Sequence, residues 1–199
     1  MRELGVDKIT AAVERLCVEA NRFLPPEAER ALRAAAESEP WPPAREILRD
    51  LERNLDAARS TPLPICQDTG LVTVYLELGQ DVHLTGGDLD GAVQEGVRRG
   101  YEAGHLRKSV VRDPLRRVNT GDNTPCTLRV RIRPGEGVKI TVSPKGAGSE
   151  NMCRVKMLTP AQGEAGVKDF VLDTVLSAGG NPCPPTVVGV GIGGGFDSV

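Results

Sequence analysis

The stretch LVTVYL at residues 71–76 decides the fold, because the pattern of the chain changes there from helix to strand. Its many β-branched and apolar residues predict a β-strand. The preceding TPLP at residues 61–64 ends the helical part of the chain. The five residues CQDTG at 66–70 are therefore expected to form a loop that leads into this strand.

Upstream of that loop, the first sixty residues read as helical. Residues 7–24 carry apolar side chains at helical spacing, and Pro25 and Pro26 end that helix. A second helix is expected to begin at Pro26, and a third at Pro43, after the hinge PWPP at residues 40–43. The sequence thus predicts an amino-terminal helical segment over residues 1–60.

Downstream of the loop, helices and strands alternate. Asp88 is a good N-cap for a helix, and residues 163–178 predict another helix. The alternating stretches 127–133 and 138–143 flank PGEG, which predicts a β-hairpin, and residues 186–192 predict a last strand. The expected fold class is α+β: a helical segment over residues 1–60, followed by a domain with a mixed sheet over residues 61–199.

Composition limits the classes of function. The chain has 199 residues and is 39% hydrophobic, enough for a real core. Its net charge of −2, from 25 basic and 27 acidic residues, argues against nucleic acid or an anionic membrane as partner. No apolar run approaches the roughly 20 residues of a membrane span, and five cysteines make a poor disulfide framework. A soluble, cytoplasmic protein with reduced thiols is expected.

Two cysteines lie in loops that proline restricts. Cys66 stands beside Gln67 and Asp68, so that a thiol, an amide and a carboxylate share one turn. The alternative is a half-buried cysteine next to an aspartate that caps the turn. Cys183 lies between Asn181-Pro182 and Pro184-Pro185, which leaves it little freedom to pack in a core. A metal site shared by Cys66 and Cys183 is therefore plausible.

Two further loops carry groups that bind anions or form turns. Lys145 precedes GAGS at residues 146–149, where small residues let backbone N–H groups approach an anion while the lysine adds charge. A plain flexible turn explains this segment equally well. The loop NTGDN at residues 119–123 is as consistent with a self-bonded turn as with a binding loop.

In their order along the chain, five segments resemble the alpha subunit of the class I iron–sulfur fumarases and tartrate dehydratases. They are PICQDTG at 64–70, NTGDN at 119–123, KGAGSEN at 145–151, NPCPP at 181–185 and GGG at 193–195. The resemblance implies a hydro-lyase that adds water to fumarate to give malate, with a beta subunit as partner in a homo- or hetero-oligomer. Tartrate dehydration, and a noncatalytic metal-binding or assembly module, are the alternatives.

The resemblance also implies roles for particular residues. Cys66 and Cys183 would bind a [4Fe–4S] cluster whose third cysteine ligand lies beyond residue 199, in a part of the alpha subunit that this sequence lacks. Asp68 would be the general base or its hydrogen-bonding partner, and Gln67, Asp68, Arg107 and Gly148 would contact a small dicarboxylate. Lys145 is added for its charge alone. Cys126 and Cys153 align with no ligand and are expected to be packing thiols.

Overall fold

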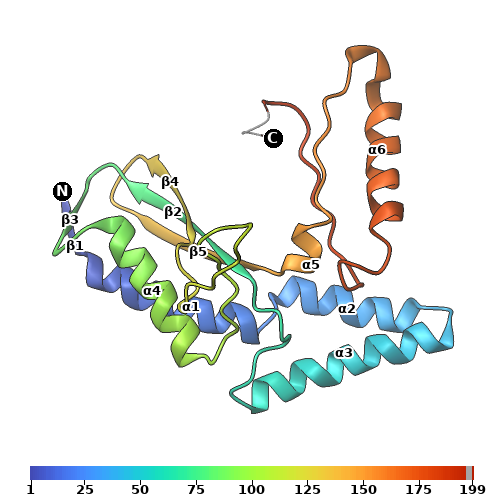
Figure 1. Cartoon of the computed structure of the whole chain (residues 1–199), viewed down its shortest axis with the longest axis horizontal. Coiled ribbons are helices and arrows are strands. Elements are labelled where there is room, and N and C mark those ends of the chain that lie inside the picture. The colour runs from blue at the N-terminus through green and yellow to red at the C-terminus, as the bar shows by residue number, and fades with distance from the viewer. Residues whose placement is uncertain (196–198) are drawn as a thin grey trace. The chain divides into compact units, whose positions relative to one another are not determined.

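The computed structural model describes residues 1–195 and Val199, and the chain divides into two compact units. The first unit, Met1–Lys145, contains the five described strands and four helices. The second unit, Gly146–Val199, contains one short helix, a 3-10 turn and one long helix. Figure 1 shows the elements in chain order. The combination of helices with a mixed sheet confirms the predicted α+β class.

The central sheet of the first unit is built around β2 (Leu71–Gly79), the strand predicted from residues 71–76. It pairs in parallel with β4 (Thr127–Arg133) on one side and antiparallel with β5 (Val138–Lys145) on the other. A separate parallel pair joins β1 (Arg2–Gly5) to β3 (Val82–Thr85), two short strands that the sequence pattern did not predict.

The predicted β-hairpin is wrong in its pairing, although both of its strands exist. β4 and β5 lie on opposite sides of β2 instead of beside each other. Two strand spacings amount to about 10 Å, which a four-residue linker can span. The linker is bonded to the end of β2 that it crosses: the Gly79 N–H donates to the Gly137 carbonyl at 2.8 Å, and the Gln80 N–H donates to the Arg133 carbonyl at 2.8 Å.

Two helices cover one face of this sheet. α1 (Val6–Arg22) packs along α4 (Leu89–Ala103) and lies against β5. The start of α4 is as predicted, since the Asp88 carboxylate caps it by accepting from the Gly91 N–H at 2.6 Å. The buried core joins side chains from both helices to those of β2; its most deeply buried members are Ile9, Val13, Cys17, Val74, Val93, Val97 and Tyr101.

α1 and α4 approach closely because α4 carries two glycines where they meet. A Cβ atom added at Gly96 would lie 2.7 Å from the Thr10 carbonyl oxygen and 2.7 Å from Val13 Cβ. One added at Gly100 would lie 2.7 Å from Cys17 Cβ. α1 thus belongs to the same core as the sheet, and the first compact unit runs from Met1 to Lys145.

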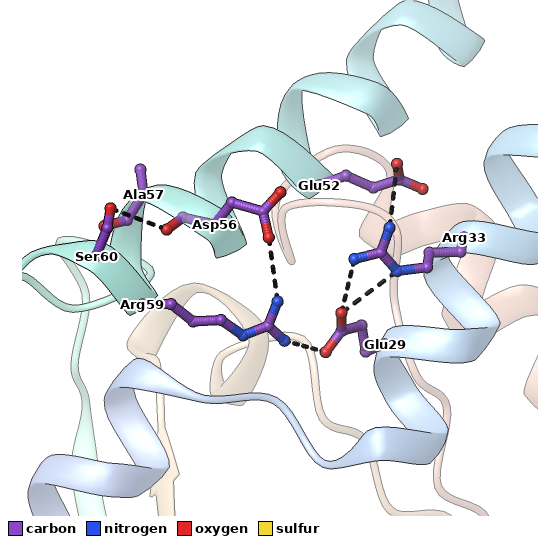
Figure 2. Close-up of polar contacts among 7 residues, drawn as sticks. All are labelled: Glu29, Arg33, Glu52, Asp56, Ala57, Arg59 and Ser60. Atoms are coloured by element: carbon purple, nitrogen blue, oxygen red, sulfur yellow. Dashed lines mark hydrogen bonds and ion pairs between the residues drawn. The ribbon is translucent and has the colours of Figure 1, made fainter.

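The helices predicted to begin near Pro26 and Pro43 form a pair, α2 (Pro26–Ser38) and α3 (Pro42–Ser60). Figure 2 shows the ion pairs that join them: the Glu29 carboxylate binds Arg33 of its own helix at 2.8 Å and Arg59 of α3. Arg33 also lies 3.9 Å from Glu52. Hydrogen bonds from Arg33 and then from Arg59 lower the pKa of Glu29, so this carboxylate stays ionised between its two cations.

The second unit contains α5 (Ala147–Glu150), a 3-10 turn at Pro160–Gln162 and α6 (Gly163–Ala178). α6 has the bounds predicted from the sequence. The strand predicted at residues 186–192 is wrong, because this segment has no regular secondary structure and Val187 is 96% exposed. A β-branched run becomes a strand only beside a pairing partner, and the described residues of this unit form no other strand.

None of the helices in the described residues is long and apolar enough to cross a bilayer.

Candidate functional site

The loop that carries Cys66, Gln67 and Asp68 connects α3 to β2. Cys66 and Gln67 are exposed, whereas Thr69 and Gly70, which follow them, are buried. Within the loop, Cys66 Sγ lies 3.3 Å from Gln67 Oε1, and the Asp68 N–H donates to Cys66 Sγ at 3.5 Å. The predicted accessible thiol is confirmed, and the half-buried alternative does not hold.

The loop is fixed at its start through Ile65. The Ile65 N–H donates to the carbonyl of Asn21 in α1 at 2.9 Å, and its carbonyl accepts from Asn54 Nδ2 of α3 at 2.8 Å. Asn21 is itself buried, and its side chain donates to the Cys17 carbonyl at 2.9 Å. Two helices therefore hold the residue immediately before Cys66.

A buried tyrosine fixes the end of the loop. The Tyr101 hydroxyl on α4 lies 2.6 Å from the carbonyl oxygen of Thr69 and 3.2 Å from that of Gly70. Burial, and then the proximity of Cys17, raises the pKa of Tyr101, so the hydroxyl remains a hydrogen-bond donor. Gly70 has a φ of +70°, a left-handed conformation that suits glycine, and this turns the chain into β2.

Asn123 joins the loop to the segment that carries Arg107. Its side chain is wholly buried: Oδ1 accepts from the Ser109 N–H at 2.7 Å and the Val110 N–H at 3.2 Å, and Nδ2 donates to the Gly70 carbonyl at 3.2 Å. The predicted self-bonded turn is also present around it, because Asn119 Oδ1 accepts from the Gly121 N–H at 2.7 Å. Residues 119–123 thus form a self-bonded turn, and Asn123 also connects Gly70 to Ser109 and Val110.

The first unit therefore brings several predicted site residues to one end of its sheet. The Thr69 hydroxyl accepts from the backbone N–H of Arg107 at 2.9 Å, which places Arg107 beside the loop. The side chains of Arg107 and Lys108 are exposed there. Lys145 pairs with Leu71 in the sheet register, so the end of β5 also reaches the residue that follows the loop. The backbones of Arg107 and Lys145 thus lie beside the loop that carries Cys66, and their positive charges favour an anionic ligand.

The other predicted residues, Cys183 and Gly148, belong to the second unit. Cys183 is exposed and has a left-handed φ of +57°. Gly148 contributes to the same unit by its lack of a side chain, because an added Cβ would lie 2.9 Å from the carbonyl oxygen of Asn181. The requirement for glycine at 148 thus has a local cause: close approach of the loop that precedes Cys183.

The five cysteines differ in how readily they could bind a metal. Burial raises the pKa of Cys17 to about 12 and that of Cys126 to about 11, so both stay protonated at neutral pH, whereas metals bind the thiolate. Cys66, Cys153 and Cys183 are exposed and in no disulfide. The exposure of Cys153 is at odds with the packing role expected for it. Across residues 1–195 and Val199, no three or more His, Cys, Asp or Glu side chains gather as a metal site.

Thr69 and Asn123 lie in two of the segments that carry the family resemblance, but sequence reasoning assigned no role to either of them or to Tyr101. Tyr101 was recognised only as a member of the apolar face of its helix. One signal was available, because a tyrosine on a buried helical face needs a partner for its hydroxyl. Asn123 offered no such signal, since its burial depends on contacts with residues more than ten positions away.

Comparisons with known proteins identify the family. Residues 10–199 match the family described as "Fumarate hydratase (Fumerase)". The chain belongs to the fumarate hydratase family. A relative named putative L(+)-tartrate dehydratase subunit alpha, from Methanocaldococcus jannaschii, is 39% identical over 196 residues, which cover 96% of this chain and 68% of the relative.

A second group of relatives comes from Escherichia coli. The L(+)-tartrate dehydratase subunit alpha of strain K12 is 28% identical over 195 residues, which cover 96% of this chain and 64% of the relative. The protein of that name in strain UTI89 gives the same identity and coverage. This member of the fumarate hydratase family therefore spans about two thirds of the length of the relatives it matches.

Proposed function

We propose that this chain is a subunit of an iron–sulfur hydro-lyase that adds water to fumarate to give malate. The observation that carries the proposal is the Cys66-Gln67-Asp68 turn, whose Cys66 and Gln67 are exposed, which is fixed at both ends and has the Arg107 backbone beside it. Membership of the fumarate hydratase family supports the class of reaction. The positive charge of Arg107 suits an anionic substrate locally, although the chain as a whole has a net charge of −2.

In this proposal, Cys66 and Cys183 hold a [4Fe–4S] cluster together with a third ligand. The thiols fit that role, because both are exposed, neither is in a disulfide and both lie in loops. When bound, such a cluster supplies an iron that acts as Lewis acid on the substrate's hydroxyl and carboxylate. A beta subunit and a cytoplasmic location are part of the same proposal.

The side chains of this chain would bind the substrate and move the proton. Arg107 would hold one carboxylate with its planar guanidinium, with Lys145 and the Gly148 backbone as further contacts. During hydration, Asp68 would take a proton from the attacking water, or orient the group that does so, and pass that proton on to solvent. The other alkene carbon would gain a proton from solvent, so that one water molecule is added overall, and dehydration reverses these transfers. Gln67, whose amide lies beside Cys66 Sγ, would orient the substrate next to the thiolate.

Tartrate dehydration is the second candidate, because the relatives from both organisms are named tartrate dehydratase subunits. The same machinery would serve both reactions, since each adds or removes water beside a carboxylate. Steady-state assays of the reconstituted alpha–beta complex with each acid distinguish the two. A kcat/KM for fumarate at least tenfold above that for tartrate supports the fumarase assignment, and the reverse ratio replaces it.

Anaerobic cluster reconstitution tests the iron–sulfur enzyme itself. The alpha–beta complex should take up iron and sulfide, and Cys66→Ser or Cys183→Ser should remove the uptake. Cys153→Ser is the matched control, because Cys153 is equally exposed but aligns with no ligand. A complex that binds no iron and sulfide, with cysteine variants that alter only stability, would leave a noncatalytic assembly module as the better explanation.

A further inference from the structure

The hydroxyl of Thr69 joins two segments that carry proposed substrate-binding residues. Thr69 is only 2% exposed, and its Oγ1 accepts from the Arg107 N–H at 2.9 Å and donates to the Arg107 carbonyl at 3.2 Å. One side chain thus satisfies both backbone groups of a residue 38 positions away. Asp68, the proposed base, is bonded directly to Thr69 in the chain, so this hydroxyl couples the backbones of Asp68 and Arg107.

The neighbouring contacts hold Thr69 itself in place. The Tyr101 hydroxyl binds the Thr69 carbonyl, and Asn123 ties Gly70 to Ser109 and Val110. Neither of these two side chains is bonded to Arg107 in the described residues. The residues on either side of Arg107 are held as well, because the Leu106 N–H donates to the Tyr101 carbonyl at 3.0 Å and Asn119 Nδ2 donates to the Lys108 carbonyl at 2.9 Å. Among the described residues, only the Thr69 side chain binds the backbone of Arg107 itself.

Because the side chain of Arg107 is exposed, fixing its backbone affects where the guanidinium lies as well as the stability of the fold. Its side chain has several rotatable bonds and lies in solvent, so the guanidinium can be aimed only if its backbone is fixed. A displacement of about 1 Å between a substrate clamp and a reacting group costs on the order of 100-fold in rate. A backbone tether at Arg107 reduces that displacement.

We propose that Thr69 is a positioning residue: its hydroxyl fixes Arg107 relative to Asp68, so that a dicarboxylate held by Arg107 presents its reacting carbon to the water from which Asp68 takes a proton. The inference rests on the function proposed above. Thr69 contacts neither the substrate nor the cluster in this scheme. It acts only through the backbone of Arg107.

The test compares Thr69→Val with Thr69→Ser in the cluster-loaded alpha–beta complex. Valine keeps the shape and branching of threonine but removes the hydroxyl, whereas serine keeps the hydroxyl. Thr69→Val should keep normal cluster content, raise KM for the dicarboxylate and lower kcat/KM by about 10- to 100-fold. Thr69→Ser should stay within about threefold of the wild type, because both bonds to Arg107 can still form.

Two readouts separate positioning from general support of the fold. Amide hydrogen exchange at Arg107 should accelerate at least about tenfold in Thr69→Val and not in Thr69→Ser, whether or not a cluster is bound. In an Arg107→Ala background, Thr69→Val should lower kcat/KM no further, since it acts through Arg107. A residue that only stabilises the fold would give additive losses. If Thr69→Val does not fold, Thr69→Ala replaces it with the same expectations.

Particular results would overturn the inference. If the wild type is active and Thr69→Val keeps kcat/KM within about twofold while losing protection at Arg107, this inference is overturned but the proposed function is not. Equal losses of kcat/KM in Thr69→Val and Thr69→Ser have the same consequence. A wild-type complex that takes up no cluster and turns over neither fumarate nor tartrate overturns the proposed function and this inference with it.

Discussion

Replacing Gly96 of α4 by alanine should destabilise the protein, although the same change in an exposed helix usually stabilises. In an unobstructed helix, Gly→Ala gains about 1 kcal/mol in helix propensity. At Gly96, however, the new Cβ would lie 2.7 Å from both the Thr10 carbonyl oxygen and Val13 Cβ. Carbon atoms in contact prefer about 3.5–4.0 Å, so α1 and α4 would have to separate by about 1 Å.

The size of the effect follows from these opposing contributions. Overpacking of a core costs about 1–3 kcal/mol, and the upper end applies here because a backbone carbonyl has no rotamer to change. After subtraction of the propensity gain, the free energy of unfolding should fall by about 2 kcal/mol for Gly96→Ala. Gly100→Ala should behave alike, since its Cβ would lie 2.7 Å from Cys17 Cβ.

Urea denaturation followed by far-UV circular dichroism measures this change, with Gly91→Ala as the matched control on the same helix. An added Cβ at Gly91 would lie 3.2 Å from the Asp88 carboxylate, the movable end of a side chain. That variant should be unchanged or up to about 1 kcal/mol more stable. If Gly96→Ala is stabilised as much as Gly91→Ala with an unchanged m value, close helix packing does not require a glycine there.

Three further predictions concern the loop and its supports. Tyr101→Phe should lower the free energy of unfolding by about 1–3 kcal/mol, measured by urea denaturation, because the buried carbonyl of Thr69 loses its hydroxyl donor; no change would mean that water replaces the bond. Cys17 should weaken the fold in alkali: its pKa is 9.0 without burial and about 12 in the folded protein, so stability is full below pH 9 and falls as pH rises toward 12. Between pH 8 and 10, wild type should therefore lose about 1.4 kcal/mol relative to Cys17→Ala, and a constant difference would contradict the shift. In the loaded complex, Asp68→Asn should keep the cluster and lose turnover, whereas Cys66→Ser should lose both; equal loss of cluster, measured by iron content, would make Asp68 structural.

Local signals in the sequence predicted the elements of the fold well. The Asp88 cap and the bounds of α6 are encoded by neighbouring residues, and both are confirmed. Strand pairing is not local: β4 and β5 looked like a hairpin, but each prefers an edge of β2, whose residues lie more than fifty positions earlier than those of β4. Residues 186–192 have strand composition without a partner, and composition alone does not make a strand.

The site was predictable to a similar extent. The Cys66-Gln67-Asp68 turn is visible in the sequence because its reactive groups are adjacent. Its supports are not visible, since Tyr101 and Asn123 come from segments 31 to 53 positions away and their roles depend on burial in the folded unit. The family resemblance added Arg107, and the structure adds the reason why Arg107 lies beside the loop.

The anchoring of the loop at both ends also limits how it can be made. Its partners are spread from Asn21 to Asn123, so during synthesis the cysteine is exposed before Tyr101 and Asn123 exist. Contacts of such high sequence separation form slowly and late in folding. A peptide of residues 64–70, or the same seven residues grafted into another scaffold, would have the reactive groups without the shape. Reproducing the shape of this loop elsewhere requires the chain from Asn21 through Asn123.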